Sequence, residues 1–453
     1  MTHSTRAELI PARLFGGIEP AGIAIVAVSG GSDSLALLLL AHVWATEKNL
    51  TLHAVTVDHG LRPEAAAEAG FVGAVCEGLG IDHTTLGWDG LKPHSGLPDA
   101  ARRARYTIME EFAGAIGATT ILTGHTLDDQ AETVWMRSQR GEAGSGGRGL
   151  SGMARITLLP GGTQLVRPLL EVTRGQLRDY LATYPQSWVE DPTNRDPSYE
   201  RVRVRRMLKH NPALRDRLAE FSKAAARLRA VKSRDTALLL QATTRMEAGP
   251  VFHLDMELAI GAPRSVLLHA LQILIAIAGG GEYLVPPERL AALIDEGDGE
   301  DRRSVMRNTL GGAVIERVSG GLRFYRERRN LESVLLAPGE SVLWDGRFEI
   351  VNNTSDTVHA GALTRLALKE TESTLNRQLD VRPRAALLSS LMVGTAKGDI
   401  HFPFADTGDG VSGLELRLTA RAIEYFCPET DFPLLEWLHG LDAARNAFLQ
   451  PRS

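Results

Sequence analysis

The chain has 453 residues, too many for one ordinary hydrophobic core, so its length favours two or three domains. Its composition, 43% hydrophobic and 23% charged residues, is typical of a soluble globular protein, and no segment reaches the roughly 18 apolar residues that span a bilayer. The first residues lack the cationic start and apolar stretch of a secretory signal, so we expect a cytoplasmic protein with no membrane partner.

Cysteine content and charge narrow the function classes further. The only cysteines, Cys76 and Cys427, are far apart in sequence, which argues against a disulfide framework, a zinc site or an iron–sulfur cluster. The formal net charge of −5 does not indicate nucleic-acid binding by the chain as a whole. Residues 201–234 differ, because they are dense in arginine and lysine and contain only Asp216 and Glu220 as acids. This segment is either a solvated helix face or an RNA-binding surface.

Strands and helices are predicted to alternate over the first part of the chain. An apolar, β-branched run at 21–29 predicts a buried strand, and a leucine-rich helix follows from Ser34. The same order then repeats, with strands at 50–60, 81–88 and 119–125 and helices at 63–79, 97–116 and 127–139. This pattern predicts an α/β fold with a parallel sheet covered on both faces by helices, whose ligands gather at the carboxyl ends of the strands.

The remaining sequence predicts smaller modules. Residues 140–153 form a glycine-rich loop, and residues 164–184 indicate an edge strand and a helix. The pattern is helical from Asn211 to about residue 278, with a further helix at 289–297. From residue 309 onward, short apolar runs alternate with glycine turns, which is typical of a β-rich unit. We therefore expect three parts, with boundaries at 1–212, 213–300 and 301–453.

The sequence SGGSDS directly follows the first predicted strand. A glycine-rich turn before a helix presents unpaired N–H groups and the positive end of the helix dipole, which together favour a phosphate. Neither the GxxxxGK[ST] nor the GxGxxG pattern is present. Asp33 would repel a phosphate unless Mg²⁺ bridged the two, so we predict a metal-bound nucleotide with Asp33 as the metal ligand. The nucleotide would be held by Ser29, Gly30, Gly31, Ser32, Asp33 and Ser34. The alternative is that Asp33 only caps the helix.

A second polar cluster surrounds the predicted strand at 119–125. Asp129 and Glu132 are three residues apart, so both carboxylates lie on one face of the following helix, where they could hold amino groups or accept a proton. Arg105, on the preceding helix, could bind a carboxylate through two parallel hydrogen bonds. His125 could donate to a phosphate or to a reacting oxygen. The alternative is a surface helix with an intrahelical pair beside a structural histidine.

These motifs resemble a known family. The sequence SGGSDS is similar to the pyrophosphate loop of the N-type ATP pyrophosphatases. The order and approximate spacing of tRNA(Ile)-lysidine synthetases are matched over 23–206 by VDHGLRPEAAAEA, AARRARY, GHTLDDQAET, GLSGM, VRPLLEVTRGQL and EDPTNRDPSYERVRVR. The resemblance implies a Rossmann-like PP-loop ATPase domain at 1–212, a helical tRNA-binding module at 213–300 and a mixed α+β tRNA-binding region at 301–453.

The resemblance also implies the reaction and the roles of its residues. ATP adenylates the C2 oxygen of the wobble cytidine in the isoleucine tRNA with a CAU anticodon, and the ε-amine of free L-lysine then displaces AMP, giving lysidine. A homodimer is compatible with the resemblance. The implied roles are lysine handling by Arg105, Asp129 and Glu132; catalysis by Asp33, His125, Asp129 and Glu132; nucleotide binding by the SGGSDS loop with Asp58, His59 and Arg62; and tRNA binding or closure of the site by Asn194, Arg201, Arg205 and Arg206.

The chain departs from the family pattern at three places. Thr126 replaces the second of two histidines, Val202 replaces an asparagine, and the glycine-rich loop is longer before Gly149. Two alternatives remain open: a tRNA thiolase of the same superfamily, which the lack of paired cysteines disfavours, and a non-catalytic nucleotide- or RNA-binding relative. For tRNA, we expect the basic segment and helical module to grip the tRNA body and the β-rich region to meet the acceptor stem.

Overall fold

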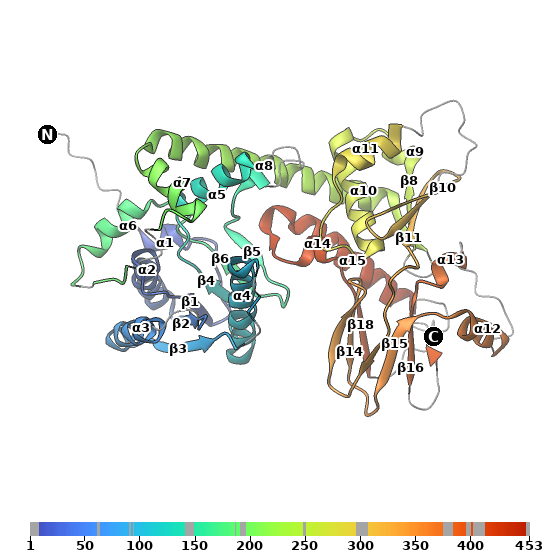
Figure 1. Ribbon diagram of the computed structural model, residues 1–453, viewed down its shortest axis with the longest axis horizontal. Helices are drawn as coiled ribbons and strands as arrows, with labels where there is room; N and C mark the ends of the chain where they lie inside the picture. Colours follow the sequence, from blue (N-terminus) through green and yellow to red (C-terminus); the bar gives the residue numbers. More distant parts are fainter. Residues whose placement is uncertain are drawn as a thin grey trace. The chain divides into compact units, whose positions relative to one another are not determined.

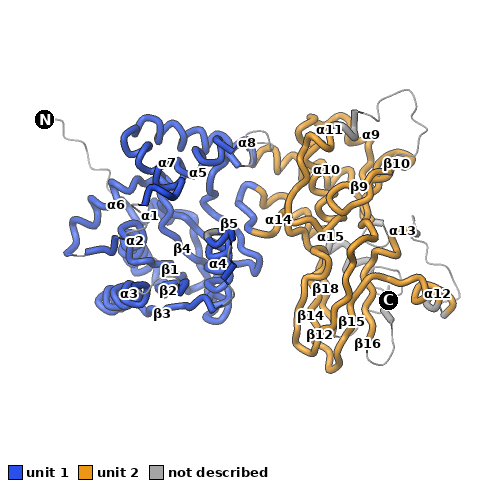
Figure 2. Tube along the Cα trace, in the orientation of Figure 1, with its two compact units in different colours: residues 1–229, 426–430 blue, residues 230–425, 431–453 orange. Residues whose placement is uncertain are grey.

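The computed structural model describes two compact units. Unit 1 comprises residues 1–229 and 426–430, and unit 2 comprises residues 230–425 and 431–453 (Figure 2). The structure therefore has two compact units. The division into three functional parts, at 1–212, 213–300 and 301–453, stays a prediction. The described residues are 9–60, 64–89, 92–93, 95–140, 149–185, 187–190, 196–247, 251–295, 307–374, 384–395, 400–401 and 413–449.

Unit 1 is built on a seven-stranded sheet with the order β19-β5-β6-β4-β1-β2-β3 (Figure 1). The strands from β6 to β3 are parallel, which confirms the predicted α/β fold. The predicted edge position of the strand at Gln164 is wrong, because β5 pairs antiparallel with β6, and β19 pairs with β5. The strands are β1 (Ile23–Ala27), β2 (Thr51–Asp58), β3 (Asp82–Gly87), β4 (Thr120–Leu122), β5 (Ile156–Leu158), β6 (Gln164–Val166) and β19 (Cys427–Pro428).

Helices cover both faces of this sheet because side chains alternate along each strand. Ala24 and Val26 of β1 belong to one apolar cluster with α2, α3 and α6, whereas Ile25 belongs to another with Tyr106 and Met109 of α4. The helices are α1 (Pro11–Leu14), α2 (Ser32–Lys48), α3 (Ala65–Leu79), α4 (Leu97–Ile116), α5 (Leu127–Gln139), α6 (Arg174–Leu181), α7 (Glu200–Lys209) and the first part of α8 (Pro212–Thr243).

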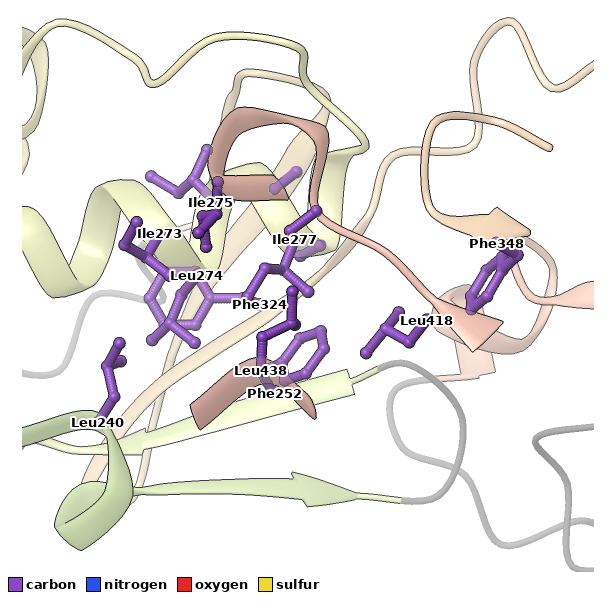
Figure 3. Close-up of a cluster of buried hydrophobic side chains, with 14 of the residues drawn as sticks. Leu240, Phe252, Ile273, Leu274, Ile275, Ile277, Phe324, Phe348, Leu418 and Leu438 are labelled. Carbon is purple, nitrogen blue, oxygen red and sulfur yellow. The ribbon is translucent and has the colours of Figure 1, made fainter. Parts of the chain in front are cut away.

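Unit 2 is centred on α10 (Arg264–Gly279), an apolar helix that is buried on all sides (Figure 3). Its core brings Ile273, Leu274 and Ile277 together with Phe252 and Phe324 of the neighbouring sheet. No helix among the described residues meets the length and hydropathy required to cross a membrane. The other helices are the second part of α8, α9 (Met256–Ala259), α11 (Pro287–Asp295), α12 (Arg365–Thr374), α13 (Arg384–Leu387), α14 (Arg421–Glu424) and α15 (Phe432–Leu449).

The strands of unit 2 form three sheets, ordered β7-β8-β11-β10-β9, β12-β15-β16-β17 and β13-β14-β18. The predicted helical run to residue 278 is interrupted by β7 and β8, because the sequence VFHLD pairs with β11 as a buried antiparallel strand. The strands are β7 (Thr244–Glu247), β8 (Val251–Asp255), β9 (Arg307–Leu310), β10 (Ala313–Val318), β11 (Gly321–Arg326), β12 (Val334–Leu336), β13 (Ser341–Trp344), β14 (Phe348–Asn352), β15 (Val358–Ala362), β16 (Leu391–Thr395), β17 (Ile400–His401) and β18 (Leu414–Leu418).

Candidate active site

The loop SGGSDS joins the carboxyl end of β1 to the first turn of α2. Gly31 is the residue before the helix and makes no side-chain cap, so the first-turn N–H groups are not bonded by a capping side chain. The loop is braced internally, because the Ser29 N–H donates to Ser34 Oγ at 3.1 Å and Ser34 Oγ donates to the Gly31 carbonyl at 3.0 Å. This arrangement is a preformed place for an anion at a helix N-terminus.

Two glycines are required for the loop to take this shape. Gly30 has a φ of +80°, which disfavours any side chain, and its carbonyl accepts from the Val189 N–H at 2.9 Å. Gly124, at the end of β4, lies so close to the loop that a Cβ added there would stand 3.0 Å from the carbonyl oxygen of Asp33. The loop and the turn after β4 therefore abut through their backbones.

Asp33 lies in the first turn of α2 and faces the turn after β4. Its Oδ1 accepts from Ser32 Oγ at 3.2 Å, and its Oδ2 accepts from Arg174 Nε at 3.1 Å. Burial raises the pKa of the Asp33 carboxyl, and the negative charge of Asp129 raises it further, against the opposing effect of Arg174. The positive charge of Arg174 therefore does not fully offset the burial of this carboxylate. This fits a residue that binds a further cation.

Thr126 fixes the direction of Asp129. The two residues form a capping box at the start of α5, in which Asp129 Oδ2 accepts from the Thr126 N–H at 2.9 Å and from Thr126 Oγ1 at 2.7 Å. One carboxylate oxygen is therefore occupied by the helix cap, and Oδ1 is left to face the site. Thr126, which stands where the family pattern has a histidine, therefore has a structural role. It caps the start of α5 through its hydroxyl group.

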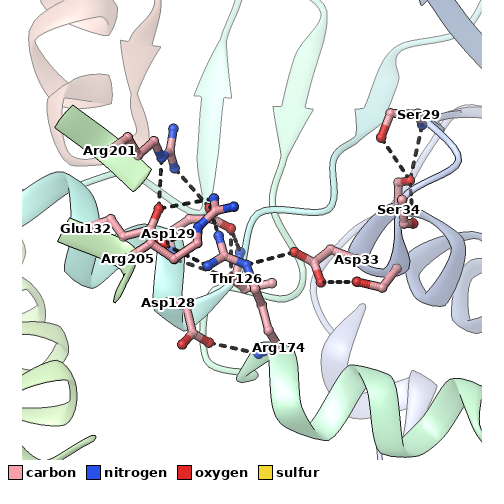
Figure 4. A network of polar contacts seen from close by, with 12 residues as sticks. Ser29, Asp33, Ser34, Thr126, Asp128, Asp129, Glu132, Arg174, Arg201 and Arg205 are labelled. Atoms are coloured by element: carbon pink, nitrogen blue, oxygen red, sulfur yellow. Dashed lines mark hydrogen bonds and ion pairs between the residues drawn. The ribbon is translucent and has the colours of Figure 1, made fainter. Parts of the chain in front are cut away.

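Asp129 and Glu132 lie together on the buried face of α5, as predicted, and three arginines surround them (Figure 4). Glu132 Oε1 accepts from Arg174 Nη1 at 2.7 Å and from Arg205 Nε at 2.9 Å, while its Oε2 accepts from Arg201 Nε at 2.8 Å. Asp129 Oδ1 accepts from Arg201 Nη2 at 2.9 Å and also from Arg174 Nη2. The acidic pair is thus neutralised by arginines of the same chain.

The packing of α7 on α5 places two of these arginines. Val204 and Leu208 of α7 are buried against Ala131 of α5. Arg201 and Arg205 are one turn apart, so they project from the same side of α7 toward the acidic pair. Val202, the second position that departs from the family pattern, is itself buried.

The charge of the acidic pair is stabilised by these contacts. Burial alone would raise the pKa of both carboxyls, but Arg174, with Arg201 at Asp129 and Arg205 at Glu132, holds each pKa below its ordinary value. Both carboxylates are therefore ionised at neutral pH and are weak bases. This arrangement suits holding a cation better than removing a proton from one.

A cluster of positive charge lies at the end of β4. His125 Nδ1 lies 3.1 Å from Thr123 Oγ1, and its pKa is held well below the ordinary value by burial and by the nearby guanidiniums of Arg167, Arg105 and Arg102. The Nε of Arg105 and the Nε of Arg167 are buried without a hydrogen-bond partner among the described residues. His125 is therefore neutral at pH 7, beside a set of cations suited to an anionic ligand.

The second strand also ends at this edge. The carboxylate of Asp58 accepts from the Gly60 N–H at 2.8 Å and so shapes the turn after β2. The ring of His59 packs edge-on against Trp88, with 5.9 Å between the ring centroids. Burial and the charge of Arg105 lower the pKa of His59, which shows that Arg105 acts electrostatically on both histidines.

The structure thus gathers most of the predicted residues at one edge of the sheet. Arg206 is exposed on α7, whereas Arg201 and Arg205 face the acidic pair. Arg62, Asn194 and residues 141–148 of the glycine-rich loop lie outside the described residues. Arg174 was not predicted as a site residue, although it lies in the motif VRPLLEVTRGQL. The capping-box pattern Thr173–Gln176 was the signal that Arg174 begins a helix.

Comparison with known proteins identifies relatives of this chain. The model of a PP-loop domain matches residues 11–211. A tRNA(Ile)-lysidine synthase of Brucella anthropi is 36% identical over 432 residues, covering 92% of this chain and 93% of the relative. A tRNA(Ile)-lysidine synthase of Mesorhizobium japonicum is 39% identical over 405 residues, covering 86% and 88%.

Proposed function

This chain belongs to the tRNA(Ile)-lysidine synthase family, and we propose that it uses ATP to join free L-lysine to C2 of the wobble cytidine in an isoleucine tRNA with a CAU anticodon. The reaction proceeds through an adenylated cytidine and releases pyrophosphate and AMP. The protein is a ligase that forms a carbon–nitrogen bond, and it acts in the cytoplasm. One observation carries the proposal: Arg174 joins Asp33, in the first turn of α2, to the buried acidic pair Asp129 and Glu132.

The acidic pair supplies the place for the nucleophile. Free lysine has a side-chain pKa of about 10.4, so almost all of it is an ammonium ion at neutral pH. Asp129 and Glu132 are ionised because the neighbouring arginines lower their pKa values, and they bind and orient this ammonium. The directions of these pKa shifts favour positioning over proton removal, the two roles that the sequence left open, so the ammonium loses its proton to water before the amine attacks C2.

The cluster around His125 supplies the place for negative charge. Burial lowers the pKa of His125, and the nearby guanidiniums of Arg167, Arg105 and Arg102 lower it further. Among them, Arg105 binds the carboxylate of the substrate lysine, because its buried Nε is available for a hydrogen bond. His125 is neutral, so one of its ring nitrogens donates a hydrogen bond to the phosphate or to the reacting oxygen.

A magnesium ion fits Asp33. The raised pKa of this carboxyl indicates that its charge is incompletely balanced in the protein alone, and one carboxylate together with nucleotide phosphates is a common Mg²⁺ ligand set. When bound, the ion neutralises charge on the phosphates. Ser29 to Ser34 then hold the pyrophosphate portion through backbone N–H groups, with Asp58 and His59 nearby.

The basic surface beyond the site is proposed to bind tRNA. Arg206 is exposed on α7, and α8 continues the basic segment. Arginines in such a segment bind phosphates without reading base sequence, so they contribute affinity rather than selection of the tRNA. A homodimer is part of the same proposal and is tested by measuring the mass of the protein in solution.

Thiol chemistry receives no support from the described residues. Cys76 and Cys427 are both buried and neither forms a disulfide, and burial raises the pKa of the Cys76 thiol to about 11. A thiol with so high a pKa is almost entirely protonated at neutral pH. The thiolase alternative is therefore not favoured.

Mass spectrometry of the modified tRNA tests the proposal. The purified protein is incubated with ATP, Mg²⁺, L-lysine and the isoleucine tRNA, and the nucleosides of the digested tRNA are weighed. We expect a lysidine peak that requires lysine and that is lost in Asp33→Asn, while a surface variant such as Glu200→Gln retains it. Release of AMP without lysidine would contradict the assigned nucleophile or RNA, and release of neither product by a folded protein would support a binding-only relative.

A further inference from the structure

Arg174 occupies the centre of the candidate active site. Its three guanidinium nitrogens contact three different carboxylates: Nε contacts Asp33, Nη1 contacts Glu132 and Nη2 contacts Asp129 (Figure 4). Its side chain is only 17% exposed. The site is therefore complementary in shape and charge to one planar guanidinium that reaches both the ATP loop and the acidic pair.

The backbone of Arg174 is held in place at the start of α6. It is the first residue of α6, directly after Thr173, whose capping box with Gln176 defines the helix start. Its backbone N–H donates to Asp128 Oδ2 at 2.8 Å. The backbone is thus anchored to α5, while the long side chain retains several rotatable bonds through which the guanidinium can move.

The acidic pair itself has no unbalanced negative charge for an additional cation. Asp129 and Glu132 face the guanidiniums of Arg174, Arg201 and Arg205, so their two negative charges are already balanced. Adding the ammonium of a substrate to this set would bury an uncompensated positive charge, which is costly. One guanidinium must therefore withdraw from Asp129 and Glu132 when the substrate binds.

Arg174 is the guanidinium that links Asp33 to the acidic pair. Arg201 and Arg205 contact the acidic pair from α7, and their side chains are 39% and 30% exposed. Of these three arginines, Arg174 contacts Asp33, so Arg174 lies between the SGGSDS loop and the acidic pair. In the proposed function, this is where the nucleophile meets the activated base. When it leaves the acidic pair, it can stay on the Asp33 side, where the phosphates provide negative charge.

We propose that Arg174 determines the specificity of the amino-acid site by excluding free L-arginine. This inference rests on the proposed function, in which L-lysine is the substrate. An ammonium is compact and needs only the space between Asp129 and Glu132, so Arg174 can withdraw part of the way. The guanidinium of free L-arginine needs the whole planar site that the Arg174 guanidinium occupies, so it must displace Arg174 completely.

Competition between the two amino acids tests this inference. The inhibition constant of L-arginine against L-lysine is divided by the KM of L-lysine, in the wild type and in Arg174→Ala. We expect this ratio to fall at least about tenfold in Arg174→Ala, a change of about 1.4 kcal/mol in relative binding. Arg178→Ala is the matched control, because Arg178 lies one turn later on α6 and is exposed; its ratio should equal that of the wild type.

A second variant and a second measurement cover the other outcomes. Arg174→Lys keeps a positive charge among the carboxylates, so it tests the inference if Arg174→Ala does not fold, and we expect a smaller fall in the same ratio. Calorimetric titration of L-lysine and L-arginine into each variant with ATP gives the same comparison without tRNA. An unchanged ratio in the folded variants, or an equal fall in Arg178→Ala, overturns the inference. Absence of lysidine with the wild type would instead refute the proposed function, and the calorimetric ratio would still decide the role of Arg174.

Discussion

Replacing Glu132 by glutamine should destabilise unit 1 strongly. The Glu132 side chain is 1% exposed and contacts the guanidiniums of Arg174, Arg201 and Arg205. Glutamine keeps the shape but removes the charge that these three groups share. Breaking a buried ion pair by removing one partner costs about 3–5 kcal/mol, and we take the lower end, about 3 kcal/mol, because Asp129 still balances part of the charge. In a domain of this size, such a loss lowers the unfolding temperature by about 6–12 °C.

Thermal unfolding of the full chain at several pH values measures this effect. The pKa of Glu132 is lowered in the folded protein, so the stability that its charge contributes is present above the unfolded pKa of 4.5 and is lost as the pH falls through the lower folded value. We therefore expect the difference between Glu132→Gln and the wild type to be full at pH 7 and to shrink below about pH 4.5.

Glu200→Gln provides the matched control for this experiment. Glu200 also contacts an arginine, with 2.7 Å between Arg140 Nη2 and Glu200 Oε2, but the two side chains are 58% and 43% exposed. An exposed ion pair contributes about 0–1 kcal/mol, so this variant should unfold near the wild-type temperature. Equal small shifts for both glutamine variants, or a Glu132→Gln shift that acid leaves unchanged, would refute the reasoning that buried charge pairing holds this site together.

Three further changes test other parts of the structure. Gly124→Ala should weaken ATP binding, measured by calorimetry, about tenfold, because the new Cβ would lie 3.0 Å from the Asp33 carbonyl oxygen and displace the SGGSDS loop. Unchanged affinity would contradict this close approach. Phe426→Ala should lower the urea-unfolding free energy by about 1 kcal/mol, since it removes an edge-on contact with Tyr106 at 5.4 Å between ring centroids, whereas Phe426→Tyr should retain most of it. His125→Gln should reduce the loss of stability in acid. Because the pKa of His125 is lowered in the folded protein, the wild type loses stability as the pH falls below the unfolded value of 6.5. Equal pH profiles of the urea midpoints for the two proteins would argue against a buried neutral histidine.

Local sequence patterns determined the architecture of unit 1 and the position of its SGGSDS loop. The helices predicted at 97–116 and 127–139 occur with those bounds, because apolar periodicity and end signals act within a few residues. Asp129 and Glu132 share a helix face because their spacing alone requires it. The pattern SGGSDS after a buried strand likewise indicated a turn at the start of a helix, where the structure has it.

Tertiary packing alone decided what surrounds those residues. Arg174 and Arg201 reach the acidic pair from two helices that pack on different partners, and no local period relates them to Asp129. The edge strand β19 joins the sheet from residue 427, far along the chain, and β8 replaced an expected helix because β11 offered it a partner. A side chain's own neighbours in sequence set its local conformation, whereas its charge partners depend on which distant elements the fold brings into contact. The acidic pair was therefore predictable, and the arginine that fills it was not.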